Sequence, residues 1–139
     1  MKSACLIVGA GAGIGGHTGK LFAKKGYHTC LCRRSDAKGL DKIVTEIKQS
    51  GNDASGFILD ATQNDTIENL VSEIEETIGP IEVAIYNLGA QIGDKSLKET
   101  SNKQFELGWR LGTFGLFRLA SSLFPKMVKR GKGAVIVTS

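Results

Sequence analysis

Short apolar runs alternate with amphipathic stretches along the whole chain. The runs cover residues 4–8, 28–32, 55–59, 81–86 and 134–138 and have the length of buried strands. The stretches between them carry apolar residues three and four positions apart, as in Leu40, Ile43 and Ile47, which is the period of an amphipathic helix. Strands that alternate with helices of 10–15 residues are typical of right-handed βαβ units. The pattern therefore predicts an α/β fold with a doubly wound parallel sheet.

Three local features refine this prediction. Asp65 and Glu68 stand at the spacing of a capping box and mark a helix start. A long apolar-striped helix is expected from about Asn102 to Lys129, and Pro125 is expected to kink it or to begin its last turn afresh. The fifth strand is uncharged and needs a covered edge that the sequence after it does not supply. We therefore expect one domain over residues 1–139, cut after its fifth strand.

Glycine is concentrated at one place. It makes up 18 of the 139 residues, nearly twice the usual share of about 7%, and five glycines lie between positions 9 and 16, after the first strand and at the start of the first helix. Backbone N–H groups there can face an anion, and glycine lets a pyrophosphate approach. The spacing G-x-x-x-G-x-G fits Gly9, Gly13 and Gly15 without a shift. The alternative is a loop that only packs the helix on the strand. The candidate cofactor-binding residues of this loop are Gly9, Gly11, Ala12, Gly13, Ile14 and Gly15.

The end of the second strand bears on the choice of nucleotide. A site for NAD(H) places a carboxylate there, about 20 residues after the glycines, to bond the ribose 2′-hydroxyl. This chain has Arg33 and Arg34 at that position, and the first acid is Asp36. Guanidinium groups bind a phosphate through paired hydrogen bonds. The sequence therefore favours NADP(H) over NAD(H), with a solvated basic turn as the alternative.

Three spaced motifs together resemble those of the short-chain dehydrogenase/reductase family. The glycine motif is the first, although Val8 stands where the family usually has Thr. Asp60-Ala61 follows the third strand and is similar to the acidic position that contacts adenine in the family. Tyr86-Asn87-Leu88-Gly89 follows the fourth strand and resembles the family's Asn-Asn-Ala-Gly with two departures. The resemblance covers the whole chain and implies a Rossmann-type fold in which Asp60, Ala61, Asn87, Leu88 and Gly89 contact the cofactor.

The resemblance also implies a reaction. Relatives transfer hydride between a nicotinamide and a carbonyl or alcohol carbon, and a Tyr-x-x-x-Lys pair handles the proton. Here Tyr27 and Tyr86 are followed four residues later by Leu31 and Ala90, so neither belongs to such a pair.

Two further positions of the family's chemistry can be located. Gly112 aligns with the family's helical Asn, and Ser139 is either its serine or that residue's neighbour, which makes Ser139 the catalytic candidate. We expect an NADP(H)-dependent oxidoreductase whose first 139 residues hold the cofactor site and are inactive alone. The alternative is a non-catalytic NADP(H)-binding module or regulatory subunit.

Other classes of function receive less support. The three cysteines lie in apolar runs without a histidine that would complete a metal site, which favours reduced core thiols and no metal. No apolar stretch has the length of a membrane helix or the form of a signal peptide, so a cytoplasmic protein without a membrane partner is expected. The net charge is +4, but no aromatic residues interleave with the basic cluster at residues 126–132, so nucleic acid is not an expected partner.

The resemblance implies a homo-oligomer that packs through the 102–129 helix.

Overall fold

A single parallel sheet forms the centre of the molecule. The computed structural model describes residues 1–88 and 95–138. The described strands are β1 (Ala4–Val8), β2 (His28–Arg33), β3 (Ala54–Ile58), β4 (Ile81–Tyr86) and β5 (Ala134–Val137). Their order in the sheet is β3-β2-β1-β4-β5, and every pair is parallel. The direction in which strands are added therefore reverses between β1 and β4.

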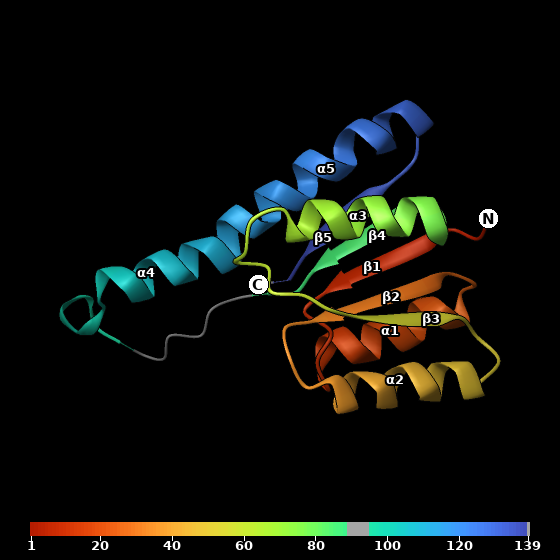
Figure 1. The fold of residues 1–139 in the computed structure, drawn as a ribbon, viewed down its shortest axis with the longest axis horizontal. Helices are drawn as coiled ribbons and strands as arrows, with labels where there is room; N and C mark the ends of the chain where they lie inside the picture. Colours follow the sequence, from red (N-terminus) through yellow and green to blue (C-terminus); the bar gives the residue numbers. More distant parts are fainter. Residues whose placement is uncertain (89–94, 139) are drawn as a thin grey trace.

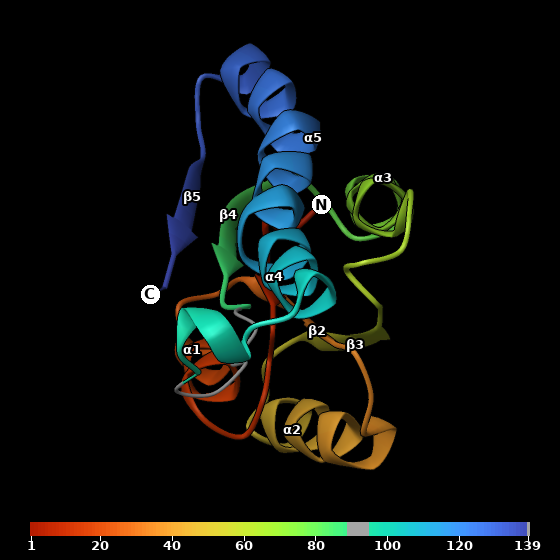
Figure 2. The ribbon, with the colours of Figure 1, turned by 90° about the vertical axis from the view of Figure 1, so that its left-hand side faces the viewer.

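Helices cover both faces of this sheet. The described helices are α1 (Ile14–Lys24), α2 (Ala37–Gln49), α3 (Thr66–Thr77), α4 (Asn102–Trp109) and α5 (Gly115–Arg130). Figures 1 and 2 show α1 and α2 on one face and α3 and α5 on the other. A short 3-10 turn, η1 (Leu97–Glu99), precedes α4. The predicted α/β class with a doubly wound parallel sheet of the Rossmann type is confirmed.

Strand β1 separates two apolar clusters, one on each face of the sheet. Ala4, Leu6 and Val8 belong to the cluster under α3 and α5. Cys5 and Ile7 belong to the cluster above α1 and α2. All five are at most 1% exposed, because successive side chains of a strand point to opposite faces. The continuous apolar run of the sequence is thus explained by burial on both sides.

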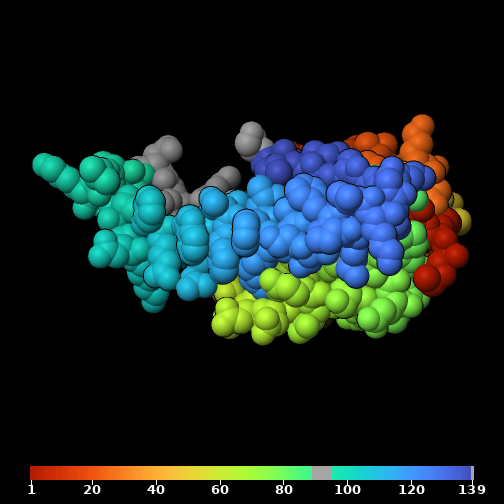
Figure 3. Space-filling model, turned by 90° about the horizontal axis from the view of Figure 1, so that it is seen from above, coloured from red at the N-terminus to blue at the C-terminus, as the bar shows by residue number. Residues whose placement is uncertain are grey.

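The predicted long helix is interrupted, but not at the proline. A π-helical segment, η2 (Arg110–Phe114), joins α4 to α5, whereas α5 continues through Pro125. The last turn therefore does not begin afresh at Pro125, whereas the kink expected there stays a prediction. Figure 3 shows α4 and α5 following one another along the molecule, with α3 beside α5.

The predicted capping box at the start of α3 is also wrong. Asp65 adopts a left-handed backbone conformation, with φ of 62°, and its side chain caps no N–H group. Glu68 instead pairs with Arg118 of α5. An arginine 50 residues away competes for that carboxylate, and spacing along the chain does not reveal it.

The π-helical segment is tied to the sheet by one side chain. Tyr86, the last residue of β4, is buried and its hydroxyl donates a hydrogen bond to the carbonyl of Leu111. A Cβ atom at Gly115 would overlap the Tyr86 hydroxyl. A Cβ at Gly112, one turn earlier, would meet open space. Close approach to Tyr86 thus requires glycine at position 115 but not at position 112.

This difference predicts opposite effects of the same substitution. Gly112→Ala should raise the free energy of unfolding by up to about 1 kcal/mol, since alanine favours helix over glycine. Gly115→Ala should lower it by about 1–3 kcal/mol, because the new methyl group overpacks against Tyr86. Adding Tyr86→Phe to Gly115→Ala should restore part of the loss. Denaturant unfolding measures all three, and a Gly115→Ala variant as stable as Gly112→Ala would contradict the described contact.

Candidate functional site

The carboxyl ends of β1 and β4 are bound to each other at the point where the strand order reverses. The backbone N–H of Asn87 donates to the carbonyl of Val8 over 2.8 Å, and its side-chain Nδ2 donates to the carbonyl of Gly9 over 2.9 Å. Gly9 has φ of +96°, and a Cβ there would overlap the Asn87 carbonyl. Open α/β sheets bind their ligands in the crevice at this position. Gly9 and Asn87 therefore build the floor of a candidate site.

The glycines of the first loop divide into two groups. Cβ atoms at Gly15 and Gly16 would overlap the carbonyls of Gly9 and Gly11, so these glycines allow α1 to pack against the loop. Cβ atoms at Gly11 and Gly13 would meet nothing within 4 Å. Gly13 is the N-cap of α1 and has no side-chain cap, and the first turn carries no acid. Helix N-terminal N–H groups need partners, so this open space can accept an anion.

The start of α1 also presents apolar surface. Ile14 is 67% exposed although it is a large aliphatic residue. Together with Ala12 it lines a shallow hollow that continues to His17 and Thr18. A bound ring or sugar would cover this surface.

Arg33, the last residue of β2, is held in place by two residues. Its Nε donates to the carbonyl of Ala10 over 2.8 Å, and its Nη1 donates to the Asp36 carboxylate over 2.9 Å. The side chain is only 12% exposed. Its Nη2 atom is buried and has no hydrogen-bond partner among the described residues. A buried donor of a charged group without a partner is costly, and an acceptor that reached this atom would relieve that cost.

A groove runs beside Arg33 between α1 and α2. It is lined by Ala12, Gly16, His17, Lys20, Arg33, Asp36, Gly39, Lys42, Ile43 and Glu46. Lys20 and Lys42 contribute cations, although Lys20 is paired with Glu46. The sequence reasoning did not identify His17 or Lys42 as part of this site, because they face Arg33 from two different helices. Only the placement of α1 and α2 brings them together.

Asp36 caps the N-terminus of α2. It adopts φ of 60° as the N-cap of α2, and its carboxylate accepts from the N–H of Gly39 over 3.1 Å as well as from Arg33. An aspartate directly before a helix is a recognised N-cap signal. Each of its two carboxylate oxygens thus accepts a hydrogen bond from the protein.

Arg34 differs from its neighbour in both burial and partner. Its side chain is 73% exposed, and its Nε lies 3.9 Å from the Asp60 carboxylate. The two predicted guanidiniums therefore have different environments. Arg33 is preorganised by the protein, whereas Arg34 must lose side-chain freedom to contact any ligand.

The third predicted contact region begins directly after β3. The Asp60 carboxylate accepts from the N–H of Thr62 over 2.9 Å and from its hydroxyl over 2.6 Å. The hydrogen bond from the Thr62 hydroxyl holds the pKa of Asp60 below its usual value, so the carboxylate stays ionised at neutral pH. Ala61 is 3% exposed. This loop therefore offers a fixed carboxylate at the same edge of the sheet.

The remaining predicted residues lie at the end of β4 and beyond. The side chain of Leu88 is partly buried against the cluster under α3 and α5. The hydroxyl of Thr138 donates to the Asn87 side-chain oxygen over 2.6 Å, which joins the end of β5 to the same junction. Gly89 and Ser139 lie outside the described residues.

Both tyrosines of the sequence pack against other parts of the protein. Burial raises the pKa of Tyr86 to about 12, and its hydroxyl is bonded to Leu111. Tyr27 precedes β2 and packs edge-on against Phe22, at the end of the strand opposite Arg33. Neither tyrosine is placed to exchange a proton with a ligand at the described crevice.

The three thiols of the sequence are buried in the core. Cys5, Cys30 and Cys32 are free and buried, and desolvation raises the pKa of each to about 12. In residues 1–88 and 95–138, no group of three His, Cys, Asp or Glu side chains could hold a metal ion. Within the same part of the chain, every helix is too short or too polar to cross a membrane.

Comparison with known proteins places this architecture among dehydrogenases. A fatty acyl-CoA reductase of Acinetobacter baylyi is 33% identical over 133 residues, which cover 94% of this chain and 44% of the relative. A 3-oxoacyl-[acyl-carrier-protein] reductase of Thermotoga maritima is 27% identical, with 97% and 54% covered. The structure of an alcohol dehydrogenase of Thermococcus sibiricus, complexed with 5-hydroxy-NADP, matches with a TM-score of 0.87 at 26% identity, with 97% and 57% covered.

The chain thus spans about half the length of the relatives that it matches. The family model described as short chain dehydrogenase matches residues 3–139. The chain therefore belongs to the short-chain dehydrogenase/reductase family.

Proposed function

We propose that this chain forms the NADP(H)-binding portion of an oxidoreductase that moves hydride between the nicotinamide and a carbonyl or alcohol carbon. The observation that carries the proposal is the buried Nη2 of Arg33, which lacks a hydrogen-bond partner within residues 1–88 and 95–138 and lies beside an open groove. An acceptor such as a 2′-phosphate would satisfy this donor with a charge-assisted hydrogen bond. The family supports the class of reaction.

The other parts of the nucleotide have fitting partners along the same edge. The pyrophosphate is assigned to the open space at Gly11 and Gly13, where α1 begins. The adenine end is assigned to Asp60 and Ala61, and the nicotinamide end to the region of Ile14 and Asn87. When bound, the nicotinamide supplies or accepts the hydride. The residues named here bind and orient it.

The engagement of Asp36 supports NADP(H) over NAD(H). A site for NAD(H) needs a carboxylate that is free to accept from the ribose 2′-hydroxyl. Asp36 is the nearest acid after β2, but it already accepts from Arg33 and from the Gly39 N–H.

The proton that accompanies hydride transfer needs a source other than Tyr27 and Tyr86. Burial keeps the Tyr86 hydroxyl protonated, and its hydrogen bond to the Leu111 carbonyl directs it toward η2 rather than toward the crevice. General acid catalysis requires a group whose pKa matches the working pH. We therefore assign the proton donor to residues other than the two tyrosines of this chain.

The outer surface of α4 and α5 supports an interface. The exposed large apolar residues there are Phe105, Leu107, Trp109, Phe117, Phe124 and Val128. Apolar side chains gathered on one helical rod commonly mark a contact surface. We propose that this surface packs against a second copy in a homo-oligomer.

The nucleotide assignment predicts a selective effect of Arg33→Gln in the intact protein. The dissociation constant of NADPH should rise about tenfold or more, which corresponds to about 1.4 kcal/mol, because the 2′-phosphate loses its charged donor. The dissociation constant of NADH should stay within about twofold. Fluorescence titration with both nucleotides measures the ratio. Arg110→Gln, which removes a cation that pairs with Glu106 on the surface, is the matched control. Equal losses for NADPH and NADH would contradict the role of Arg33.

The pyrophosphate assignment predicts that Gly13→Val abolishes binding of NADPH and NADH alike. The side chain would enter space that is open in the protein, so the loss comes from collision with the ligand. Gly11→Ala places a smaller side chain in the same space, so it should weaken the binding of both nucleotides less than Gly13→Val does. Calorimetric titration together with thermal unfolding separates binding from folding. A folded Gly13→Val variant with unchanged affinity would show that the glycines serve packing alone.

A further inference from the structure

Arg118 is a buried cation on α5 whose guanidinium points away from its own helix. The residue is 7% exposed. Its Nε and Nη2 donate to the two carboxylate oxygens of Glu68 over 2.9 and 2.8 Å. These bonds hold the pKa of Glu68 below and that of Arg118 above its usual value. The pair therefore stays ionised over the physiological pH range and links α5 to the first turn of α3.

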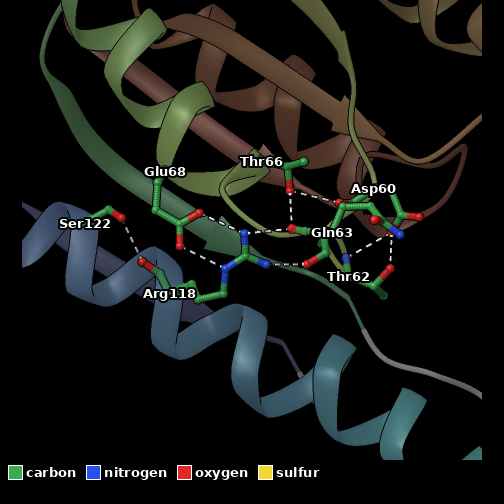
Figure 4. A network of polar contacts seen from close by, with 8 residues as sticks. Asp60, Thr62, Gln63, Thr66, Glu68, Arg118 and Ser122 are labelled. Atoms are coloured by element: carbon green, nitrogen blue, oxygen red, sulfur yellow. Dashed lines mark hydrogen bonds and ion pairs between the residues drawn. The ribbon is translucent and has the colours of Figure 1, made fainter. Parts of the chain in front are cut away.

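The same guanidinium reaches past Glu68 to the backbone of the loop that follows β3. Nη1 donates to the carbonyl of Ala61 over 2.7 Å, and Nη2 donates to the carbonyl of Gln63 over 2.9 Å. Figure 4 shows Arg118 between Glu68 on one side and this loop on the other. One side chain of α5 thus fixes two carbonyls of a segment more than 50 residues away.

This loop carries the Asp60 carboxylate. The Thr66 hydroxyl donates to the carbonyls of Asp60 and Gln63, and Thr62 binds the carboxylate itself. The carbonyls of residues 60, 61 and 63 are therefore held from inside the loop by threonine and from α5 by arginine. A loop that presents a binding group must be fixed by such supporting contacts to keep its geometry.

We propose that Arg118 is a positioning residue for the adenine end of the cofactor site. It fixes the backbone of Ala61 and Gln63, and through them it sets where Asp60 meets the nucleotide. The inference rests on the proposed function, because it takes the loop after β3 as the adenine contact. Arg118 touches no ligand itself.

The structure offers a matched control at the other end of α5. Arg130 also binds a glutamate of α3: its Nη1 and Nη2 donate to the two carboxylate oxygens of Glu75 over 2.7 and 3.1 Å. Its Nη2 also donates to a backbone carbonyl, that of Ile81, over 3.0 Å. That carbonyl opens β4, at the edge of the sheet opposite the crevice. The two arginines therefore have nearly the same chemistry, but only Arg118 supports the loop at the site.

The test compares Arg118→Lys with Arg130→Lys in the intact protein. Lysine keeps the charge but carries its three donors on one nitrogen, so it cannot reproduce the planar fork with which Arg118 makes four hydrogen bonds. Arg118→Lys should raise the dissociation constant of adenosine 2′,5′-bisphosphate and of NADPH about tenfold, since an ordered contact with the adenosine half is lost. Arg130→Lys should leave both within about twofold, although it also lowers the thermal midpoint. Calorimetric titration and thermal unfolding provide the two readouts.

A second pair of variants keeps the inference testable if Arg118→Lys does not fold. Glu68→Gln retains an oxygen for Arg118 but removes the negative charge that orients the guanidinium. Glu75→Gln makes the same change for Arg130 at the other end of α5. Only Glu68→Gln should weaken the binding of adenosine 2′,5′-bisphosphate. Equal effects within either pair would overturn the positioning role and leave a purely structural one. A wild-type protein that binds neither probe would instead overturn the proposed function.

Discussion

The close approach of β1 and β4 at Gly9 and Asn87 is the constraint on which the crevice depends. Two hydrogen bonds from Asn87, one from its backbone and one from its side chain, draw the carboxyl ends of the two strands together. The approach leaves no room for a Cβ at Gly9. Thr138 joins the end of β5 to the same asparagine. The floor of the site is thus a polar junction of three strands rather than a surface of one loop.

From this junction the glycines acquire separate roles. Gly9 and Gly15 permit the backbone to fold closely upon itself, whereas Gly11 and Gly13 leave space that the protein does not fill. The same division holds for the arginines, because Arg33 is fixed by Ala10 and Asp36 while Arg34 is largely exposed. Preorganised groups bind at lower entropic cost. Arg33 and the start of α1 are therefore the parts of the edge that are best prepared for an anionic ligand.

The sequence predicted what depends on local periodicity. The strands, their order of appearance along the chain and the glycine loop follow from apolar runs and turn residues, and the buried β1 shows why its run is uninterrupted. Contacts between distant segments were not predictable in this way. Glu68 has the spacing of a capping residue but pairs with Arg118, 50 residues later. The π-helical segment accepts a hydrogen bond from Tyr86, which lies on another element. The groove beside Arg33 needs α1 and α2 in place before Lys42 can be recognised.

The most direct test of the account is a crystal structure of the intact protein with NADP⁺. The account predicts the pyrophosphate over Gly11 and Gly13 at the start of α1, with the 2′-phosphate accepting a hydrogen bond from Nη2 of Arg33. The adenine should lie beside the loop that begins at Asp60. A nucleotide bound at another edge of the sheet, or in this crevice with its 2′-phosphate turned to solvent and Arg33 Nη2 still without a partner, would contradict it.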